Sequence, residues 1–217
     1  MKNTLKEINP DNRKFYIKIL IIGTKEVGKT QILNGICKKD FQTEYNPTFG
    51  MDFCITKYKD INPSITFQII EIGGKFPPPN DVIKNYVIDT DCFLCVYDAS
   101  KESTLKKLEK IIIEFKSFIP NDNKEQFWYF IRNKCDPKET PPEEIDKNFF
   151  ENLQLTYIKH IDFNAKLHNK FTFLLSDIIE QMKNFMRFNT HQNEETQLDI
   201  YNEKNQKEKK DGICVIF

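Results

Sequence analysis

Residues Gly23 to Thr30 read Gly-Thr-Lys-Glu-Val-Gly-Lys-Thr and fit the pattern G-x-x-x-x-G-K-[ST]. An apolar run, residues 15–22, precedes them, and apolar residues at helical spacing follow from Ile32. This strand–loop–helix context favours a phosphate-binding loop over a chance match in a glycine-containing turn, because the loop N–H groups and the helix N-terminus both attract an anion. The expected nucleotide contacts here are Gly23, Lys25, Glu26, Val27, Gly28, Lys29, Thr30 and Gln31.

Two side chains of this loop have separate expected tasks. We expect Lys29 to reach the β- and γ-phosphates, and the Thr30 hydroxyl to bind Mg²⁺. Gly28 and Gly23 allow the backbone to approach the ligand closely.

The composition indicates one globular domain followed by a tail. The chain has 217 residues, is 39% hydrophobic and carries equal numbers of acidic and basic side chains, so nothing indicates a nucleic-acid partner. No apolar run approaches the roughly 18 residues of a membrane span. The first 14 residues lack the apolar core of a signal peptide.

The six cysteines are scattered along the chain. Cys92 and Cys95 resemble a metal-binding or redox pair, but they lie in an apolar run that reads as a buried strand. Side chains three positions apart in a strand point to opposite faces, so we expect buried structural thiols. A reduced, cytosolic protein is the resulting expectation.

Strand and helix patterns alternate along the chain. Strands are expected at residues 15–22, 49–58, 64–71, 91–97, 126–132 and 156–163. Helices are expected at 29–37, 82–88, 101–118, from Pro141, and at 165–188. This order predicts a three-layer α/β fold with a mostly parallel central sheet, helices on both faces, and ligands at the carboxyl ends of the strands. We therefore expect a flexible arm (1–14), one domain (15–188) and a polar tail (189–217).

Two further motifs point to guanine. Asn133-Lys134-Cys135-Asp136 follows an expected strand. The Asp136 carboxylate can accept hydrogen bonds from N1–H and the 2-amino group of guanine, and adenine lacks that amino group. The sequence Asn164-Ala165-Lys166 opens a helix, where the Ala165 N–H can meet the guanine carbonyl. A plain polar turn is the alternative for each motif taken alone.

Two more loops carry candidate metal ligands. Thr48, in Tyr45-Asn46-Pro47-Thr48, can join Mg²⁺ when a γ-phosphate is present, although it also fits a capped turn. Glu71 ends an expected strand and can hold Mg²⁺ through water. The N–H of Gly74, three residues later, can contact the γ-phosphate. The expected metal set is Thr30, Thr48 and Glu71.

Together these motifs resemble the small GTPases of the Ras superfamily, and the Rab branch most closely, over residues 13–188. Thr48 to Phe53 resembles the Rab segment T-[IV]-G-[IV]-D-F, and Val96 to Ser103 resembles V-Y-D-[IV]-[TS]-[ND]-x-x-S. The resemblance implies a P-loop NTPase fold, GTP or GDP with Mg²⁺, and a monomer. It further implies that Phe41 packs against guanine and that Tyr45 contacts the nucleotide. Effectors, an exchange factor and an activating protein would bind residues 41–53 and 71–88 during vesicle trafficking.

Departures from the family pattern affect the expected catalytic set Lys75, Gly74 and Lys29. Lys75 stands where the family has the glutamine that orients the attacking water, and an ammonium has no acceptor for that task. Lys25 and Glu26 occupy positions of small residues. We therefore expect slow GTP hydrolysis. The alternative is a hydrolysis-deficient, GTP-locked binding scaffold. The motif Asn133 to Asp136 argues against an ATP-using kinase.

The last four residues, Cys214-Val215-Ile216-Phe217, fit the pattern C-a-a-X, and the final Phe217 suggests geranylgeranylation of Cys214. An accidental cysteine is the alternative. The tail has no net polybasic patch, and one lipid gives reversible attachment. The expected partners are a prenyl transferase, a prenyl-shielding carrier and a membrane, with the protein in the cytosol and on the cytoplasmic face.

Overall fold

The computed structural model describes residues 15–58, 65–120, 126–135, 145, 147–155, 157–166, 171 and 173–182. The chain divides into two units, residues 1–175 and 176–217. In the second unit, residues 176–182 are helical. The rest of the fold and the candidate site belong to the first unit. Within the described part of the chain, no helix combines the length and the apolar character needed to cross a bilayer.

The described strands form one six-stranded sheet in the order β2-β3-β1-β4-β5-β6. Their bounds are β1 Phe15–Ile22, β2 Met51–Tyr58, β3 Ile65–Ile72, β4 Cys92–Asp98, β5 Phe127–Asn133 and β6 Tyr157–Asp162. The pair β2 and β3, which are consecutive in the chain, is antiparallel. The other neighbours pair in parallel. The mostly parallel α/β sheet is thus confirmed, and its parallel strands all end at one edge.

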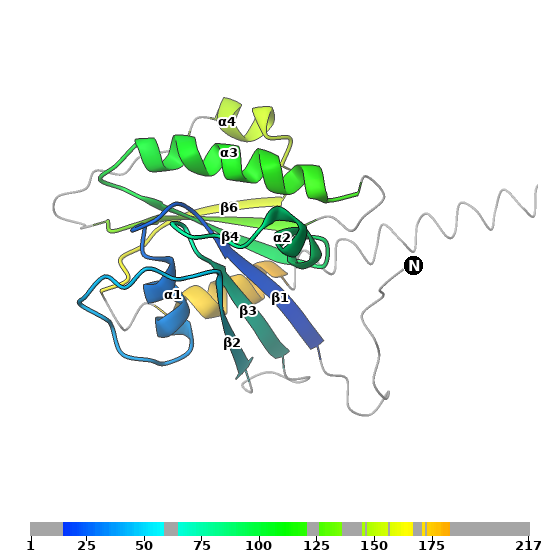
Figure 1. Ribbon diagram of the computed structural model, residues 1–217. Helices are drawn as coiled ribbons and strands as arrows, with labels where there is room; N and C mark the ends of the chain where they lie inside the picture. The colour runs from blue at the N-terminus through cyan, green and yellow to red at the C-terminus, as the bar shows by residue number, and fades with distance from the viewer. Residues whose placement is uncertain are drawn as a thin grey trace, which may run out of the picture. The chain divides into compact units, whose positions relative to one another are not determined.

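Helices cover both faces of this sheet (Figure 1). Their bounds are α1 Lys29–Ile36, α2 Asn80–Val87, α3 Ser103–Phe118 and α4 Lys147–Asn152. In Figure 1, α1 lies on the opposite side of the sheet from α3. The start of the helix predicted from Pro141 lies outside the described residues. The closing helix predicted over 165–188 is wrong at its start, because Ala165 and Lys166 form a turn. Residues 171 and 173–182 are helical as predicted, and 167–170, 172 and 183–188 lie outside the described residues.

Three consecutive prolines, Pro77 to Pro79, lie directly before α2. We predict a helix from Val82, but α2 begins at Asn80, directly after Pro79. Pro79 has no N–H to donate, but its carbonyl accepts hydrogen bonds from the N–H groups of Val82 and Ile83 at 3.0 and 3.1 Å. The proline therefore starts the helix, because its missing donor lies before the first helical bond.

The apolar runs of β1, β4 and β5 follow from burial on two faces. All seven residues of β4 and all seven of β5 are buried. One core cluster joins Leu20 and Ile22 of β1 with side chains of α2, α3 and α4. Within it, Phe93 stacks on Trp128 with ring centroids 4.3 Å apart. The core holds the strands in register and so fixes the loops at their carboxyl ends.

The cysteines follow the predictions in part. Cys92 and Cys95 are both fully buried, and only Cys95 belongs to the core cluster with α2 and α3. Burial raises the pKa of both thiols well above its ordinary value, so they are inert structural side chains, as predicted.

The expectation of a reduced protein is wrong at Cys37 and Cys54, which form a disulfide with Cα atoms 6.6 Å apart. Cys37 caps the C-terminal end of α1, and Cys54 lies in β2. The two cysteines are 17 positions apart in the sequence, and the fold brings them together. Nothing in the local sequence predicted this pairing.

Candidate nucleotide and metal site

The loop between β1 and α1 has the backbone shape that a phosphate cradle needs. Gly28 directly precedes α1 with φ at 96°, in the left-handed region. A Cβ at this position would overlap the side-chain amide of Asn133, so both conformation and space require glycine. Glu26 also has a positive φ, 65°, which is a strained conformation for a residue with a side chain. The loop therefore adopts a strained backbone conformation, which is typical of a functional loop whose N–H groups bind an anion.

Lys29 projects from the first turn of α1 into the protein. It is only 4% exposed, and its Nζ donates to the Thr24 carbonyl at 2.9 Å. Burial lowers the pKa of Lys29 to about 8, and the nearby charge of Glu71 offsets part of that effect. A bound phosphate would favour the protonated amine further, because a neighbouring anion stabilises the charged form.

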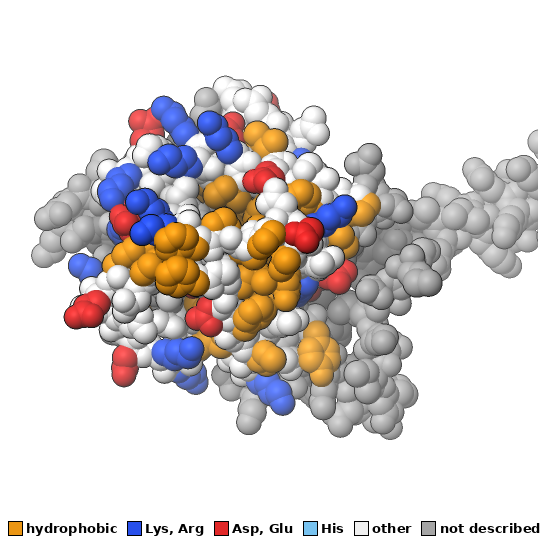
Figure 2. Space-filling model, in the orientation of Figure 1, with side chains coloured by type: hydrophobic (Ala, Val, Ile, Leu, Met, Phe, Trp, Pro, Cys, Tyr) orange, Lys and Arg blue, Asp and Glu red, His pale blue; other side chains and the backbone are white. Residues whose placement is uncertain are grey.

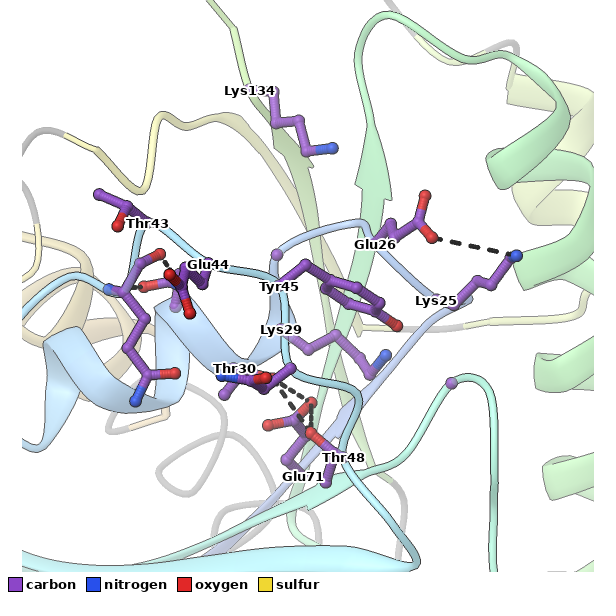
Figure 3. A pocket seen from close by; sticks show the side chains of 15 residues that line it. Lys25, Glu26, Lys29, Thr30, Thr43, Glu44, Tyr45, Thr48, Glu71 and Lys134 are labelled. Carbon is purple, nitrogen blue, oxygen red and sulfur yellow. Dashed lines mark hydrogen bonds and ion pairs between the residues drawn. The ribbon is translucent and has the colours of Figure 1, made fainter.

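Three oxygen-bearing side chains from separate segments meet beside Lys29 (Figure 3). Thr30 Oγ1 donates to Glu71 Oε1 at 2.8 Å, and Thr48 Oγ1 donates to the same oxygen at 3.2 Å. The two hydroxyl oxygens are also 3.2 Å apart. Thr30 comes from α1, Thr48 from the loop before β2, and Glu71 from the end of β3. The structure thus brings together the whole expected metal set.

The geometry of Glu71 fits a divalent cation. Its side chain is buried, and its Oε2 has no hydrogen-bond partner among the described residues. Burial raises the pKa of Glu71 despite the opposing effects of Lys29, Thr30 and Thr48. One carboxylate and two hydroxyls are the all-oxygen donors that Mg²⁺ accepts. A cation there would compensate both the unpaired oxygen and the buried charge.

Asn133, at the end of β5, connects its own strand with the phosphate loop and with the segment that follows β6. It is buried, and its amide donates to the Val27 carbonyl at 2.8 Å and accepts from the Ala165 N–H at 3.1 Å. Asn164 extends this network by donating to the Cys135 carbonyl at 3.0 Å. These bonds tie the phosphate loop to the two expected guanine motifs. Asp136, the expected base-reading carboxylate, lies outside the described residues.

Asp98 is a component of this region that the sequence reading missed. Its carboxylate lies 2.6 Å from Lys134 Nζ and also accepts from Ser100. Burial alone would raise the pKa of Asp98, but these hydrogen bonds outweigh burial and lower it. Asp98 lies opposite Asn133 in the pairing of β4 with β5. Its place as a polar residue at the end of β4, next to the strand that ends in Asn133, was the sequence feature that could have identified it as part of the site.

We call the group formed by Thr30, Thr48 and Glu71 the metal corner. A cavity of about 220 Å³ runs from this corner to Lys134. Its lining includes the predicted residues Lys25, Glu26, Gly28, Lys29, Thr30, Gln31, Tyr45, Thr48, Glu71, Gly74 and Lys134. It also includes four residues of the loop before β2 that sequence reasoning missed: Gln42, Thr43, Glu44 and Asn46. Gln31 anchors that loop, because its amide exchanges two hydrogen bonds with the backbone of Gln42 at 2.8 and 3.0 Å.

Gly74 lies against the phosphate loop. A Cβ there would come within 2.5 Å of the Lys25 backbone nitrogen and 2.7 Å of Lys29 Nζ. In Figure 3 the Tyr45 side chain lies between those of Glu26 and Lys29. The charges of Lys25 and Glu26 form an ion pair at 3.9 Å in the cavity wall.

Other predicted residues do not line the cavity. Asn133, Ala165 and Asn164 stand behind its wall in the network described above, where Val27 joins them through its carbonyl. Gly23, Phe41 and Lys166 are also absent from the lining. Lys75 lies outside it, with its Nζ 5.0 Å above the ring of Phe76. The ammonium therefore contacts an aromatic face rather than the phosphate end of the cavity.

The sequence of this chain is similar to those of known proteins. The family model described as Ras family matches residues 18–184. The Ras-related protein Rab7 of Drosophila melanogaster is 30% identical over 103 residues, which cover 48% of this chain and 49% of that protein. DnaJ homolog subfamily C member 27 of Homo sapiens is 29% identical over 126 residues, covering 57% of this chain and 46% of that protein.

The rat protein of the same name is 30% identical over 122 residues, which cover 55% of this chain and 44% of that protein. The chain spans about half the length of the curated relatives it matches. The Ras-family match extends over most of the sequence and includes the phosphate loop, the metal corner and the Asn133 network. The chain therefore belongs to the Ras family and is a Rab-like small GTPase.

Proposed function

We propose that this protein is a Rab-like molecular switch that binds GTP or GDP with Mg²⁺ and recruits effectors to a membrane in vesicle trafficking. One observation carries the nucleotide part of the proposal. The cavity has Thr30, Thr48 and Glu71 at one end and Lys134 at the other, and the phosphate loop forms the wall between them.

Within this cavity, each group has a task that its position supports. Lys29 provides a buried cation for the β- and γ-phosphates, and the loop N–H groups hold phosphate oxygens. Thr30, Thr48 and Glu71 would hold Mg²⁺, which when bound neutralises charge on the phosphates. Because Thr48 belongs to the loop before β2, its contact with the metal corner links that loop to the state of the nucleotide.

In this proposal, Asp136 reads the guanine base, and the Asn133 network positions the segments around it. The buried amide of Asn133 connects Val27 with Ala165 and so fixes the phosphate loop relative to the segment that would meet the base. The Ala165 N–H already donates to Asn133, so the base contact that we propose falls mainly on Asp136. Lys134, held by Asp98, borders the same end of the cavity.

We propose that GTP hydrolysis is slow. Three features support this view: Lys75 lies on the Phe76 ring rather than in the cavity, and Lys25 and Glu26 both line the cavity. Lysine also lacks the acceptor that would orient a water. The same features favour the second candidate, a hydrolysis-deficient, GTP-locked scaffold whose role is binding alone.

The proposed effector surface comprises residues 41–53 and 71–88. Figure 2 shows hydrophobic side chains gathered in patches on the face that it presents. The exposed apolar side chains in the two segments include Tyr45, Phe49, Phe53 and Phe76. Phe53 and Tyr86 also form a ring contact, with centroids 5.9 Å apart, that joins the segments. Clustered exposed aromatics are typical of interaction sites.

The proposed membrane attachment depends on Cys214, which lies outside the described residues. A prenyl transferase would modify this thiol, and a prenyl-shielding carrier would keep the lipid soluble in the cytosol. A single lipid without a polybasic patch gives reversible attachment to a cytoplasmic membrane face.

Replacing Glu71 tests the metal corner. We expect Glu71→Gln to raise the Mg²⁺ concentration that half-maximally slows release of a fluorescent GDP analogue by about 10- to 100-fold, because the carboxylate among the three proposed ligands loses its charge. Glu44→Gln, which changes an exposed carboxylate of the same cavity, is the matched control and should behave like the wild type. An unchanged Mg²⁺ dependence in Glu71→Gln would remove Glu71 from the metal site.

Replacing Lys75 tests the cause of slow hydrolysis. In single-turnover assays we expect the wild type to hydrolyse GTP more slowly than about 10⁻⁴ s⁻¹, below the intrinsic rate of Ras. Lys75→Gln should raise that rate by roughly tenfold or more, because the amide can orient a water. Lys107→Gln, at an exposed position of α3, is the control. An ordinary rate in the wild type contradicts slow hydrolysis, and an unchanged rate in Lys75→Gln contradicts the water-positioning explanation.

Mass spectrometry of the C-terminal peptide tests the attachment. Protein purified from cells should carry a geranylgeranyl group on Cys214, and Cys214→Ser should move the protein from the membrane fraction to the soluble fraction. Unmodified Cys214 in cells would rule out lipid anchoring at this residue. Cys92→Ala, which removes a buried thiol and leaves Cys214 in place, is the control and should stay in the membrane fraction.

A further inference from the structure

Gln31, in the first turn of α1, holds the loop that precedes β2. Its side-chain Nε2 donates to the Gln42 carbonyl at 2.8 Å, and its Oε1 accepts from the Gln42 N–H at 3.0 Å. A side-chain amide has one carbonyl oxygen and two N–H groups, so this contact uses the oxygen and one of the two donors. We call the pair of hydrogen bonds the Gln31 clamp.

Two bonds to one residue restrain the loop more than a single bond does. One hydrogen bond sets a distance. Bonds to both the N–H and the C=O of Gln42 also fix the direction of its backbone, in the way that paired residues of neighbouring strands fix each other. The clamp therefore determines how the chain leaves Gln42 toward β2.

The two sides of the clamp differ in how firmly the fold holds them. The first turn of α1 is closed by the Ile32 N–H, which donates to the Gly28 carbonyl at 3.1 Å, and Ile32 and Leu33 are buried. Gln42 is exposed to solvent. The clamp thus holds an exposed loop residue on a helix whose position the core fixes.

The residues that follow the clamp form part of the cavity wall. They are exposed, and they comprise Thr43, Glu44, Tyr45 and Asn46. Beyond them, the Thr48 hydroxyl meets the metal corner. This part of the wall is therefore anchored by the clamp on one side and by Thr48 on the other, and only the Thr48 anchor involves the expected metal ligands.

We infer that Gln31 is a positioning residue: its side chain holds the start of this loop against the cavity and so slows nucleotide release. The inference rests on the proposed function, because it requires a nucleotide in the cavity. The amide acts through the loop, and the backbone N–H of Gln31 stays the expected phosphate contact. Thr48 lies beyond the clamped residue in the chain, so its proposed response to the γ-phosphate is a separate event.

Release of a fluorescent GDP analogue from the purified full chain tests this inference. Methionine is close to glutamine in length but can make neither bond, so Gln31→Met should release the analogue about 3- to 30-fold faster than the wild type. Because the Gln31 side chain is not an expected metal ligand, a similar acceleration should appear with saturating Mg²⁺ and with a chelator. Gln68→Met, at an exposed position of β3, is the control and should match the wild type.

Gln31→Glu adds a pH readout that general damage to the site would not reproduce. Its carboxylate has no hydrogen for the Gln42 carbonyl, whereas the protonated acid has a donor and an acceptor in the places of the amide. The pKa of an isolated glutamate is about 4.3, and a hydrogen bond made only by the neutral acid raises it. The clamp is therefore restored at low pH and lost as the pH rises, so at about pH 5 Gln31→Glu should release the analogue more slowly than Gln31→Met.

The same profile separates the clamp from simple charge repulsion. Removing the repulsion between a carboxylate and the phosphates would bring the rate of Gln31→Glu down only to that of Gln31→Met. Each rate is divided by the wild-type rate at the same pH, which accounts for the other carboxylates of the cavity, Glu26, Glu44 and Glu71.

Hydrogen–deuterium exchange of the peptide covering residues 41–46 reports on the clamp itself and should accelerate in Gln31→Met together with release. The inference is overturned by unchanged release in Gln31→Met, by an acceleration that disappears in the chelator, or by exchange and release that do not change together. A Gln31→Glu variant as fast as Gln31→Met at pH 5, or faster release from Gln68→Met, overturns it as well. A wild type that does not bind the analogue overturns the proposed function itself, and a fluorescence titration before the release assay distinguishes that result.

Discussion

The buried carboxylate of Glu71 is the interaction on which the site depends. It ends β3 inside the protein, next to Lys29, and accepts hydrogen bonds from Thr30 and Thr48. A buried charge is costly unless it is paired, and the second oxygen of this one has no partner among the described residues. The arrangement therefore supports the proposal that a divalent cation binds here beside Lys29. Three chain segments meet at this carboxylate, so binding there affects all of them.

Much of the fold followed from apolar patterning. The continuous apolar runs of β1 and β4 predicted two-sided burial, and the alternation of strands with helices predicted the parallel sheet. The phosphate loop and the Asn133 motif predicted the two ends of the cavity because each follows a strand whose carboxyl end lies at one edge. The limits of α2 and the Cys37–Cys54 disulfide could not be predicted. They depend on a proline carbonyl and on contacts between distant segments, which local sequence does not record.

The side chains of the site were less predictable than its location. Glycines and small polar residues identified the loops, but nothing in the sequence indicated that Lys75 would lie on the Phe76 ring. The position of Asp98 at the end of the strand beside β5 made it a candidate for the site, but did not indicate its contact with Lys134. Both contacts depend on where a long flexible amine finds a partner after the backbone has folded. The departure from the Ras-family pattern at position 75 replaces a glutamine with Lys75, and the ring of the neighbouring Phe76 holds its ammonium outside the cavity.

Competition for the cavity tests the central claim, that it binds a guanine nucleotide with Mg²⁺. A fluorescent GDP analogue is bound to the purified full chain and displaced by GDP or by ADP, with Mg²⁺ and then with a chelator. Hydrogen-bonded base recognition predicts that GDP displaces the probe at concentrations at least about 1,000-fold lower than ADP and that the chelator speeds probe release. Equal displacement by ADP, or release that ignores Mg²⁺, would contradict the account.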